Sequence, residues 1–255
     1  MKQGCQKTRW LNLSNNRIES PSSITKFIGC PYAYFLKYIR LIKVSSSVEQ
    51  AGIGIDIHKV NEKYWGIRRD FASNEAALQE SINRNWTIKT DEESNEIINT
   101  CFSNFLESIK NNNPPIFIEE KIENPITGTV CIIDRVDIDK IVDYKTGAYF
   151  TIKPKVPALI QATLCYENLK YKHGLDFPIV EFQYLRNMKD GKGIQLVEVT
   201  PELIEQVHLL INNMRTMITN DIFPKKQSCF FCEYSKICEL EKKSIEYFKR
   251  NKLHV

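Results

Sequence analysis

The order of apolar and polar residues divides the chain into a helical first part and a mixed second part. Residues from about 55 to 110 have the pattern of helices, which end at a break of three asparagines and two prolines at 111–115. Three short strands are predicted next, at about 116–122, 128–137 and 140–146. A helix at about 157–172 and two strands at about 178–187 and 194–199 follow. This succession of strands and helices indicates an α/β fold.

Residues that start elements sharpen this division. Ser20 and Pro21 predict the start of an aromatic-rich helix that runs from 21 to about 42. Thr200 followed by Pro201 predicts another capped helix start, with an apolar stripe behind it. His208 lies within that last helix, where we expect a non-catalytic role.

Composition and charge are those of an ordinary globular protein. The 255 residues suit one domain, or a domain with a subdomain, and the net charge of +4 is compatible with nucleic acid without being diagnostic. No apolar run is long enough to cross a membrane, and the first residues lack the apolar region of a secretory signal. We therefore expect a cytoplasmic protein in a reducing setting, with no membrane partner. The sequence contains no Gly-rich phosphate loop, so it shows no ATP motor.

The most informative chemistry lies in two strands that a tight turn at Ile138 and Asp139 joins. With the turn there, Asp134 stands directly opposite Asp143, and carboxylates about 5 Å apart repel each other unless a cation lies between them. Lys145 is two residues beyond Asp143, so on a strand both side chains point the same way. Two carboxylates and a lysine suit phosphodiester hydrolysis at a divalent metal ion. A strand Asp-x-Lys alone is more often a solvated surface pair.

These residues resemble the PD-(D/E)XK nuclease superfamily, in its RecB/AddB-like branch. That family shows Gly-x-x-Asp-Arg-x-Asp on one strand and Asp-x-Lys-Thr-Gly on the next; this chain has Cys131-Ile-Ile-Asp-Arg-Val-Asp and Asp143-Tyr-Lys-Thr-Gly. The resemblance implies that Asp134 and Asp143 are catalytic metal ligands and that Lys145 is the catalytic lysine. Cys131 replaces the family's glycine, and we expect the strand to tolerate this small residue.

Further family elements lie on either side of the strand pair. A segment upstream is similar to the family's Gly-x-x-x-His helix start, which implies that His58 is a further metal ligand. Downstream, Gln161 fits the Gln-x-x-x-Tyr helix and would orient the substrate or the lysine. Tyr166 comes five residues after Gln161, which turns it about 140° from that helix face, so we leave it out of the site. On the first strand, Glu119 or Glu120 is a candidate for help with the metal, although such glutamates are usually solvated.

Four of the eight cysteines form an independent second signal. A C-x-x-C-x-x-x-x-x-C triplet near the C-terminus and one cysteine far upstream make up the set: Cys229, Cys232, Cys238 and Cys30. Four thiolates can hold an iron–sulfur cluster or zinc, and spacing alone leaves both open. The resemblance to the iron–sulfur subgroup of the branch, which includes the Cas-four family of CRISPR-associated exonucleases, favours a structural [4Fe-4S] cluster. A disulfide framework is the weakest alternative.

The resemblance extends from about 20 to 238 and implies a single nuclease domain over 1–255. Its parts would be a helical lobe at 20–113, which includes the first cluster cysteine, and a restriction-endonuclease-like α/β core at 114–220. That core would hold a mixed sheet flanked by helices. The segment 221–255 would be the cysteine-rich, cluster-binding clip.

The implied function is a Mg²⁺- or Mn²⁺-dependent deoxyribonuclease, an exonuclease acting on single-stranded DNA or DNA ends. The alternative is a cluster-stabilised DNA-binding or assembly subunit with little activity of its own. It would work with a CRISPR integrase, or with helicase, recombination or repair proteins. The intact Asp134, Asp143 and Lys145 favour the enzyme. The sequence distinguishes neither exonuclease from endonuclease nor the polarity of cleavage.

Overall fold

The structure, a computed structural model, covers most of the chain in two compact units. The described residues are 17–44, 48–110, 113–147, 151–188, 192–226 and 232–239. The described parts of the first unit are residue 17 and residues 22–44, 210–226 and 232–239. The second unit holds residues 18–21 and the described residues from 48 to 209. Among the described residues, no helix is both long enough and apolar enough to cross a bilayer.

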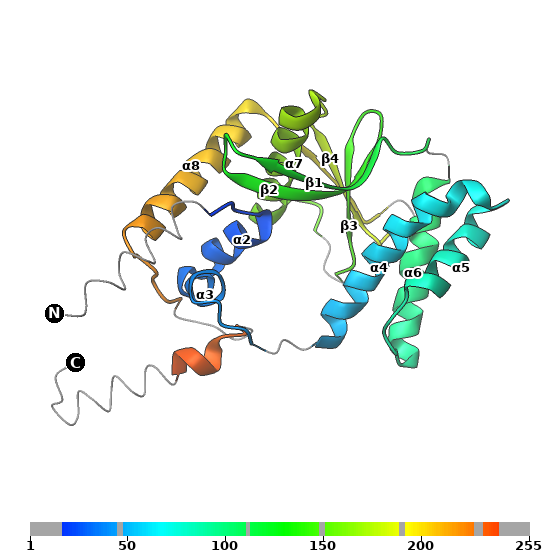
Figure 1. The fold of residues 1–255 in the computed structure, drawn as a ribbon, viewed down its shortest axis with the longest axis horizontal. Coiled ribbons are helices and arrows are strands. Elements are labelled where there is room, and N and C mark those ends of the chain that lie inside the picture. The colour runs from blue at the N-terminus through cyan, green and yellow to red at the C-terminus, as the bar shows by residue number, and fades with distance from the viewer. Residues whose placement is uncertain are drawn as a thin grey trace. The chain divides into compact units, whose positions relative to one another are not determined.

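The second unit is built on one five-stranded mixed sheet with its strands in sequence order (Figure 1). The strands are β1 (Phe117–Asn124), β2 (Thr129–Val136), β3 (Ile141–Lys145), β4 (Ile179–Tyr184) and β5 (Ile194–Glu198). All neighbours are antiparallel except β3 and β4, which are parallel and joined through α7 (Val156–His173). The predicted strands, the helix between them and the mixed α/β sheet are therefore confirmed.

The turn between β2 and β3 sets the register that places the acidic residues. Asp137 donates its backbone N–H to the carbonyl of Lys140 at 2.9 Å, which closes the turn at the predicted position. Arg135 then pairs with Val142 and Val136 with Ile141. One step further along this register, Asp134 stands opposite Asp143, as the sequence predicts.

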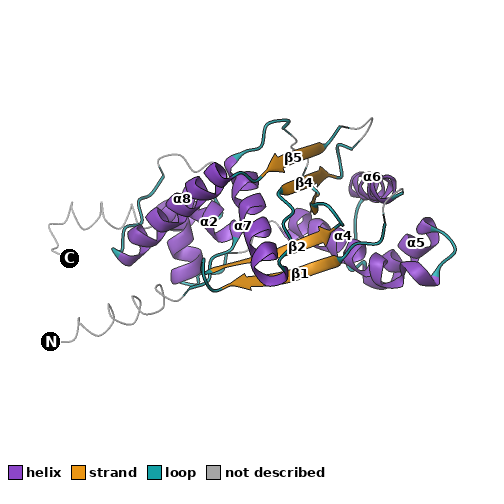
Figure 2. Ribbon diagram, turned by 90° about the horizontal axis from the view of Figure 1, so that it is seen from above, coloured by secondary structure: helices purple, strands orange, loops and turns teal. Residues whose placement is uncertain are grey.

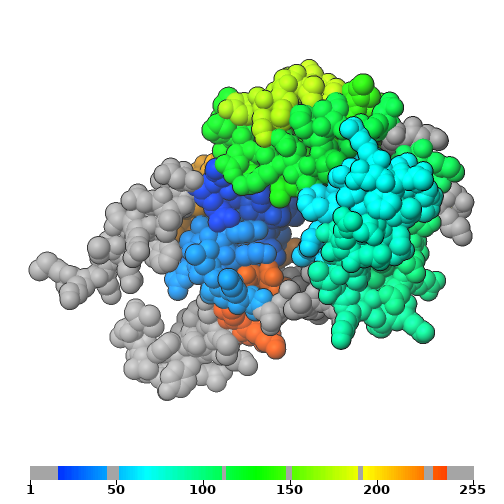
Figure 3. All heavy atoms as spheres, turned by 45° about the vertical axis from the view of Figure 1, so that its right-hand side comes forward, coloured from blue at the N-terminus to red at the C-terminus, as the bar shows by residue number. Residues whose placement is uncertain are grey.

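Helices cover both faces of this sheet (Figure 2). On one face, α7 buries Ala162, Cys165 and Leu169 against apolar side chains of the strands. On the other face, β3 presents Val142 and Tyr144 to a second core made with three helices. Val142 and Tyr144 alternate with Ile141 and Asp143 along the strand, as the two-residue period of a strand requires. In Figure 3 the three helices within residues 48–109, cyan to blue-green, form one mass against the green strands.

The predicted helical region before the sheet is also confirmed. It consists of α4 (Val48–Ile67), a 3₁₀ turn (Arg68–Asp70), α5 (Asn74–Asn85) and α6 (Glu92–Ile109). Two helix starts carry side-chain caps, because Ser73 accepts the N–H of Ala76 and Asp91 accepts the N–H of Ser94. Cys131 lies buried within β2, so the strand tolerates the residue that replaces glycine.

The first unit corrects the prediction of one long helix over 21–42. The segment is broken into α2 (Pro21–Gly29), α3 (Pro31–Tyr34) and a π-helical turn (Phe35–Ile39). Cys30 separates the first two with an extended backbone (φ −163°, ψ 107°). The physical reason is Pro31, because a proline ring clashes with a helical conformation of the residue before it.

Residues from both ends of the described chain pack together in this first unit. Lys26 forms an ion pair with Glu233 at 2.8 Å, and the Tyr234 hydroxyl donates to the carbonyl of Ile42 at 3.0 Å. Cys30 and Cys232 are half-buried and pack against the same small apolar cluster of Ala33, Leu36 and Tyr234.

Helix α8 (Pro201–Thr219) starts at the predicted position, where Thr200 Oγ1 accepts the N–H of Leu203 at 3.3 Å.

Candidate active site

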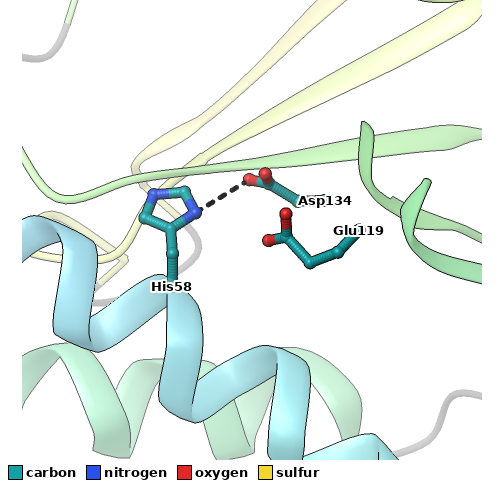
Figure 4. Close-up of side chains that lie close together, drawn as sticks. All are labelled: His58, Glu119 and Asp134. Carbon is teal, nitrogen blue, oxygen red and sulfur yellow. Dashed lines mark ion pairs between the residues drawn. The ribbon is translucent and has the colours of Figure 1, made fainter. Parts of the chain in front are cut away.

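Three side chains from α4, β1 and β2 form a group with the donor atoms of a metal site (Figure 4). His58 on α4, Glu119 on β1 and Asp134 on β2 each bring one nitrogen or oxygen ligand atom within 4.8 Å of the others. His58 Nδ1 lies 3.3 Å from Asp134 Oδ2, the pair joined by the dashed line in Figure 4. Among the described residues, this is the only such group of His, Cys, Asp and Glu side chains.

Asp134 is held in place by the strand beside it. Its Oδ2 accepts the backbone N–H of Tyr144 at 2.7 Å, so β3 fixes the carboxylate directly. Tyr144 is fixed in turn by Arg135, which is fully buried and donates from Nη1 to the Tyr144 hydroxyl at 2.6 Å. Arg135 Nη2 donates to Asp137 Oδ2 at 2.9 Å. Arg135 and Asp137 of the strand motif therefore hold Tyr144, which in turn holds Asp134.

Glu119 reaches the group through an irregularity in β1. Ile118 pairs with Arg135 and Glu120 with Ile133, but Glu119, between them, makes no strand pair in this register. Its φ of 48° lies in the left-handed region, which costs energy for any residue with a Cβ. Burial and the neighbouring charge of Asp134 raise the pKa of Glu119 to about 7. A cation bound beside Glu119 would favour its charged form and lower this pKa.

Asp143, Lys145 and Gln161 form a second network beside the first group. Lys145 Nζ lies 2.6 Å from Asp143 Oδ2 and donates to Gln161 Oε1 at 2.8 Å. Gln161 on α7 closes the triangle, because its Nε2 donates to Asp143 Oδ1. Burial raises the pKa of Asp143 to about 6, and the charge of Asp134 adds to this, while Lys145 opposes it. Gln161 is therefore hydrogen-bonded to both the acid and the lysine.

The charge of His58 is set by its carboxylate neighbours. Burial lowers its pKa, but the charge and hydrogen bond of Asp134, with help from Asp143 and Glu119, outweigh burial and raise the pKa to about 9. Metal binding requires neutral imidazole, so a divalent ion at His58 would displace a proton.

The structure also separates residues that the sequence left open. Asp143 lies outside the group of three ligand atoms around His58 and faces Lys145 and Gln161 instead. Tyr166 turns away from Gln161, as its spacing predicts, and its hydroxyl donates to Asp176 at 2.7 Å. Glu120 pairs with Lys172 of α7 at 2.5 Å.

Of the two glutamates, Glu119 is thus the one at the site, and the sequence did not single it out. The sequence shows only that Glu119 lies in a predicted strand, next to Glu120. Neither fact predicts the left-handed backbone that brings Glu119 to the site. His208, for which we expect a non-catalytic role, pairs with Glu167 of α7 at 2.9 Å.

The arrangement defines a class of protein. Two carboxylates with a histidine, next to a lysine held by an amide, are typical of enzymes that hydrolyse phosphodiesters at a divalent metal ion. The model of the PD-(D/E)XK nuclease superfamily matches residues 19–239. The chain therefore belongs to the PD-(D/E)XK nuclease superfamily.

A solved structure supports the same fold. The crystal structure of a "putative exonuclease" from Eubacterium rectale is similar to this chain with a TM-score of 0.51 and 12% sequence identity. The similarity covers 87% of this chain and 89% of that one. At this identity the likeness shows a shared fold. None of the curated proteins matches significantly.

Proposed function

We propose that this chain is a Mg²⁺- or Mn²⁺-dependent deoxyribonuclease that acts as an exonuclease on single-stranded DNA or DNA ends. The observation that carries the proposal is the metal-type group of His58, Glu119 and Asp134 beside the network of Asp143, Lys145 and Gln161. Membership of the nuclease superfamily supports it, because the matched region contains both sets of residues.

The donor atoms suit a hard divalent cation. Carboxylate oxygens are the ligands that Mg²⁺ and Mn²⁺ prefer, and an imidazole nitrogen is also accepted by Mn²⁺. His58, Glu119 and Asp134 would hold the ion, with Asp143 as a further ligand. When bound, the ion supplies an activated water at neutral pH and neutralises charge on the phosphate.

The chain's own residues would do the positioning. Gln161 fixes the Lys145 ammonium, whose charge stabilises the negative charge that develops on the phosphate oxygens during hydrolysis. The backbone of Tyr144 keeps Asp134 directed at the metal group. Glu119 and His58 would give up protons to bind metal, so the affinity for metal should rise with pH.

Cleavage of end-labelled DNA tests the proposal. Single- and double-stranded substrates would be incubated anaerobically with Mg²⁺, Mn²⁺ or EDTA, with a Lys145→Ala protein as the control for contaminating nucleases. We expect cleavage that needs metal and is lost in the variant, and the position of the label gives the polarity. A folded protein that binds DNA without cutting it would favour the alternative, an assembly subunit for a CRISPR integrase or a helicase and recombination complex.

We also propose a structural [4Fe-4S] cluster in the first unit, held by Cys30, Cys229, Cys232 and Cys238. Two of these, Cys30 and Cys232, are half-buried thiols that contact the same apolar cluster although they are distant in sequence. Cys229 lies outside the described residues. Half-buried thiols from the two chain ends suit a ligand set that joins those ends.

Metal analysis of anaerobically purified protein separates the two thiolate-bound metals. About four iron atoms with matching sulfide per chain would support the cluster, and one zinc without iron would replace it with a zinc site. A Cys232→Ser variant should lose the bound metal, whereas Cys101→Ser, at a buried thiol on α6, should keep it.

A further inference from the structure

A polar groove of about 730 Å³ lies along α6, apart from the metal group and its lysine. Its volume falls within the range of roughly 300–1,000 Å³ that ligand sites usually have. Amide, hydroxyl and guanidinium side chains line most of it: Asn95, Asn99, Thr100, Ser103, Asn104 and Arg186. Two acids, Glu92 and Glu96, complete the lining near the start of the helix.

Hydrogen bonds connect one end of this groove to the catalytic strand. Asn104 Nδ2 donates to the carbonyl of Leu185 at 2.6 Å, and the N–H of Leu185 donates to the carbonyl of Lys145 at 2.9 Å. Lys145 and Tyr184 end the parallel strands β3 and β4, and they are register partners. Ligands of open α/β sheets bind beyond the carboxyl ends of parallel strands. The groove therefore begins where a nucleic-acid strand that extends from Lys145 would pass.

The charge along the groove is uneven. Arg186 adjoins the end that is connected to Lys145, where its guanidinium lies against the Cys101 thiol. Its buried Nε has no hydrogen-bond partner in the described part of the chain. Glu96 is eight residues before Asn104 on the helix, which is about 12 Å at the usual rise. A phosphate is therefore favoured at the Arg186 end and repelled at the other.

The exposed amides on this helix face suit nucleotide bases. Asn95 and Asn99 lie one turn apart on an exposed helix face. An amide both donates and accepts, which matches the edge of an unpaired base. The Asn95 oxygen already accepts the Thr90 hydroxyl, so its NH₂ group would donate to the base. We propose that this groove binds a single-stranded segment of the substrate beside the cleaved phosphodiester, with Arg186 on a phosphate and Asn95 and Asn99 on base edges. This inference rests on the proposed nuclease function.

Binding of a labelled single-stranded oligonucleotide in EDTA tests the groove without cleavage. Arg186→Gln should weaken binding about tenfold and make the negative slope of log K against log salt shallower by about 0.7, the value for one lost phosphate contact. Asn99→Ala, at an exposed position, should weaken binding about two- to tenfold and leave the slope unchanged. Arg84→Gln on α5 is the matched control, because Arg84 is exposed and pairs with Glu80 outside the groove.

The outcomes separate the groove from the proposed function. If wild-type protein cleaves DNA and Arg186→Gln binds like wild type or like Arg84→Gln, the groove inference is wrong and the nuclease stands. If wild-type protein neither binds nor cleaves DNA, both fall together. Thermal unfolding of Arg186→Gln and Asn99→Ala guards against a folding artefact, since both should unfold like wild type while they bind less tightly; wild-type affinity in Asn99→Ala would contradict its contact with a base.

Discussion

Removal of the Tyr144 hydroxyl tests how strongly the buried support behind Asp134 contributes to stability. Arg135 is fully buried, its Nη1 donates to the Tyr144 hydroxyl at 2.6 Å, and its Nε has no partner among the described residues. In Tyr144→Phe, Nη1 would lose its acceptor and stay buried. A hydrogen bond to a charged group contributes about 1.5–3 kcal/mol, so we expect a loss of that size in the free energy of unfolding.

The loss should be visible in thermal unfolding and not in catalysis. For a chain of this size, each kcal/mol shifts Tm by about 2–4 °C, so Tyr144→Phe should unfold about 3–12 °C lower than wild type. The backbone N–H of Tyr144 still donates to Asp134, so metal-dependent activity below Tm should remain within about twofold. Circular dichroism and the cleavage assay measure the two effects.

A matched control separates the effect of removing the Tyr144 hydroxyl from the effect of removing a tyrosine hydroxyl elsewhere. Tyr171 on α7 is 46% exposed, and Tyr171→Phe should leave Tm unchanged. If both variants have the wild-type Tm, Arg135 does not depend on the Tyr144 hydroxyl. If Tyr144→Phe is stable but inactive, the tyrosine has a direct role that this reasoning lacks.

Three further outcomes follow from single contacts. Gln161→Leu should lower kcat about 10–100-fold with a smaller change in KM, because Lys145 loses its amide partner; equal kcat in the cleavage assay would refute this. Ser73→Ala should lower the free energy of unfolding by about 1 kcal/mol in urea, since the N–H of Ala76 loses its cap. In EDTA, Tm should fall as pH rises from about 5 to 7. The raised pKa of Glu119, about 7, means that the folded state keeps a proton the unfolded chain releases, and Glu119→Gln should flatten this fall.

The acidic hairpin shows what a sequence can predict by itself. A two-residue turn fixes the pairing of its strands, so placing the turn at Ile138 and Asp139 was enough to set Asp134 opposite Asp143. The helical period likewise places Tyr166 away from Gln161. Both inferences depend on local hairpin and helix geometry, which is the same in all proteins.

Other features depend on interactions that no local rule provides. Glu119 reaches the metal group through a left-handed backbone, which contacts of the surrounding fold must support. The direction of the Asp143 carboxylate toward Lys145 and Gln161 depends on how α7 packs on the sheet. By contrast, the helix break at Cys30, which our sequence analysis missed, could have been predicted from the sequence, because Pro31 follows it directly.

Binding of Mn²⁺ to DNA-free protein, followed by electron paramagnetic resonance, tests the central claim most directly. Glu119→Gln keeps the size of the side chain and removes its charge, and Glu120→Gln makes the same change one residue away, at a glutamate that pairs with Lys172. We predict that Glu119→Gln weakens Mn²⁺ binding at least about tenfold and that Glu120→Gln binds like wild type. Equal affinity in both variants would contradict a metal site formed by His58, Glu119 and Asp134.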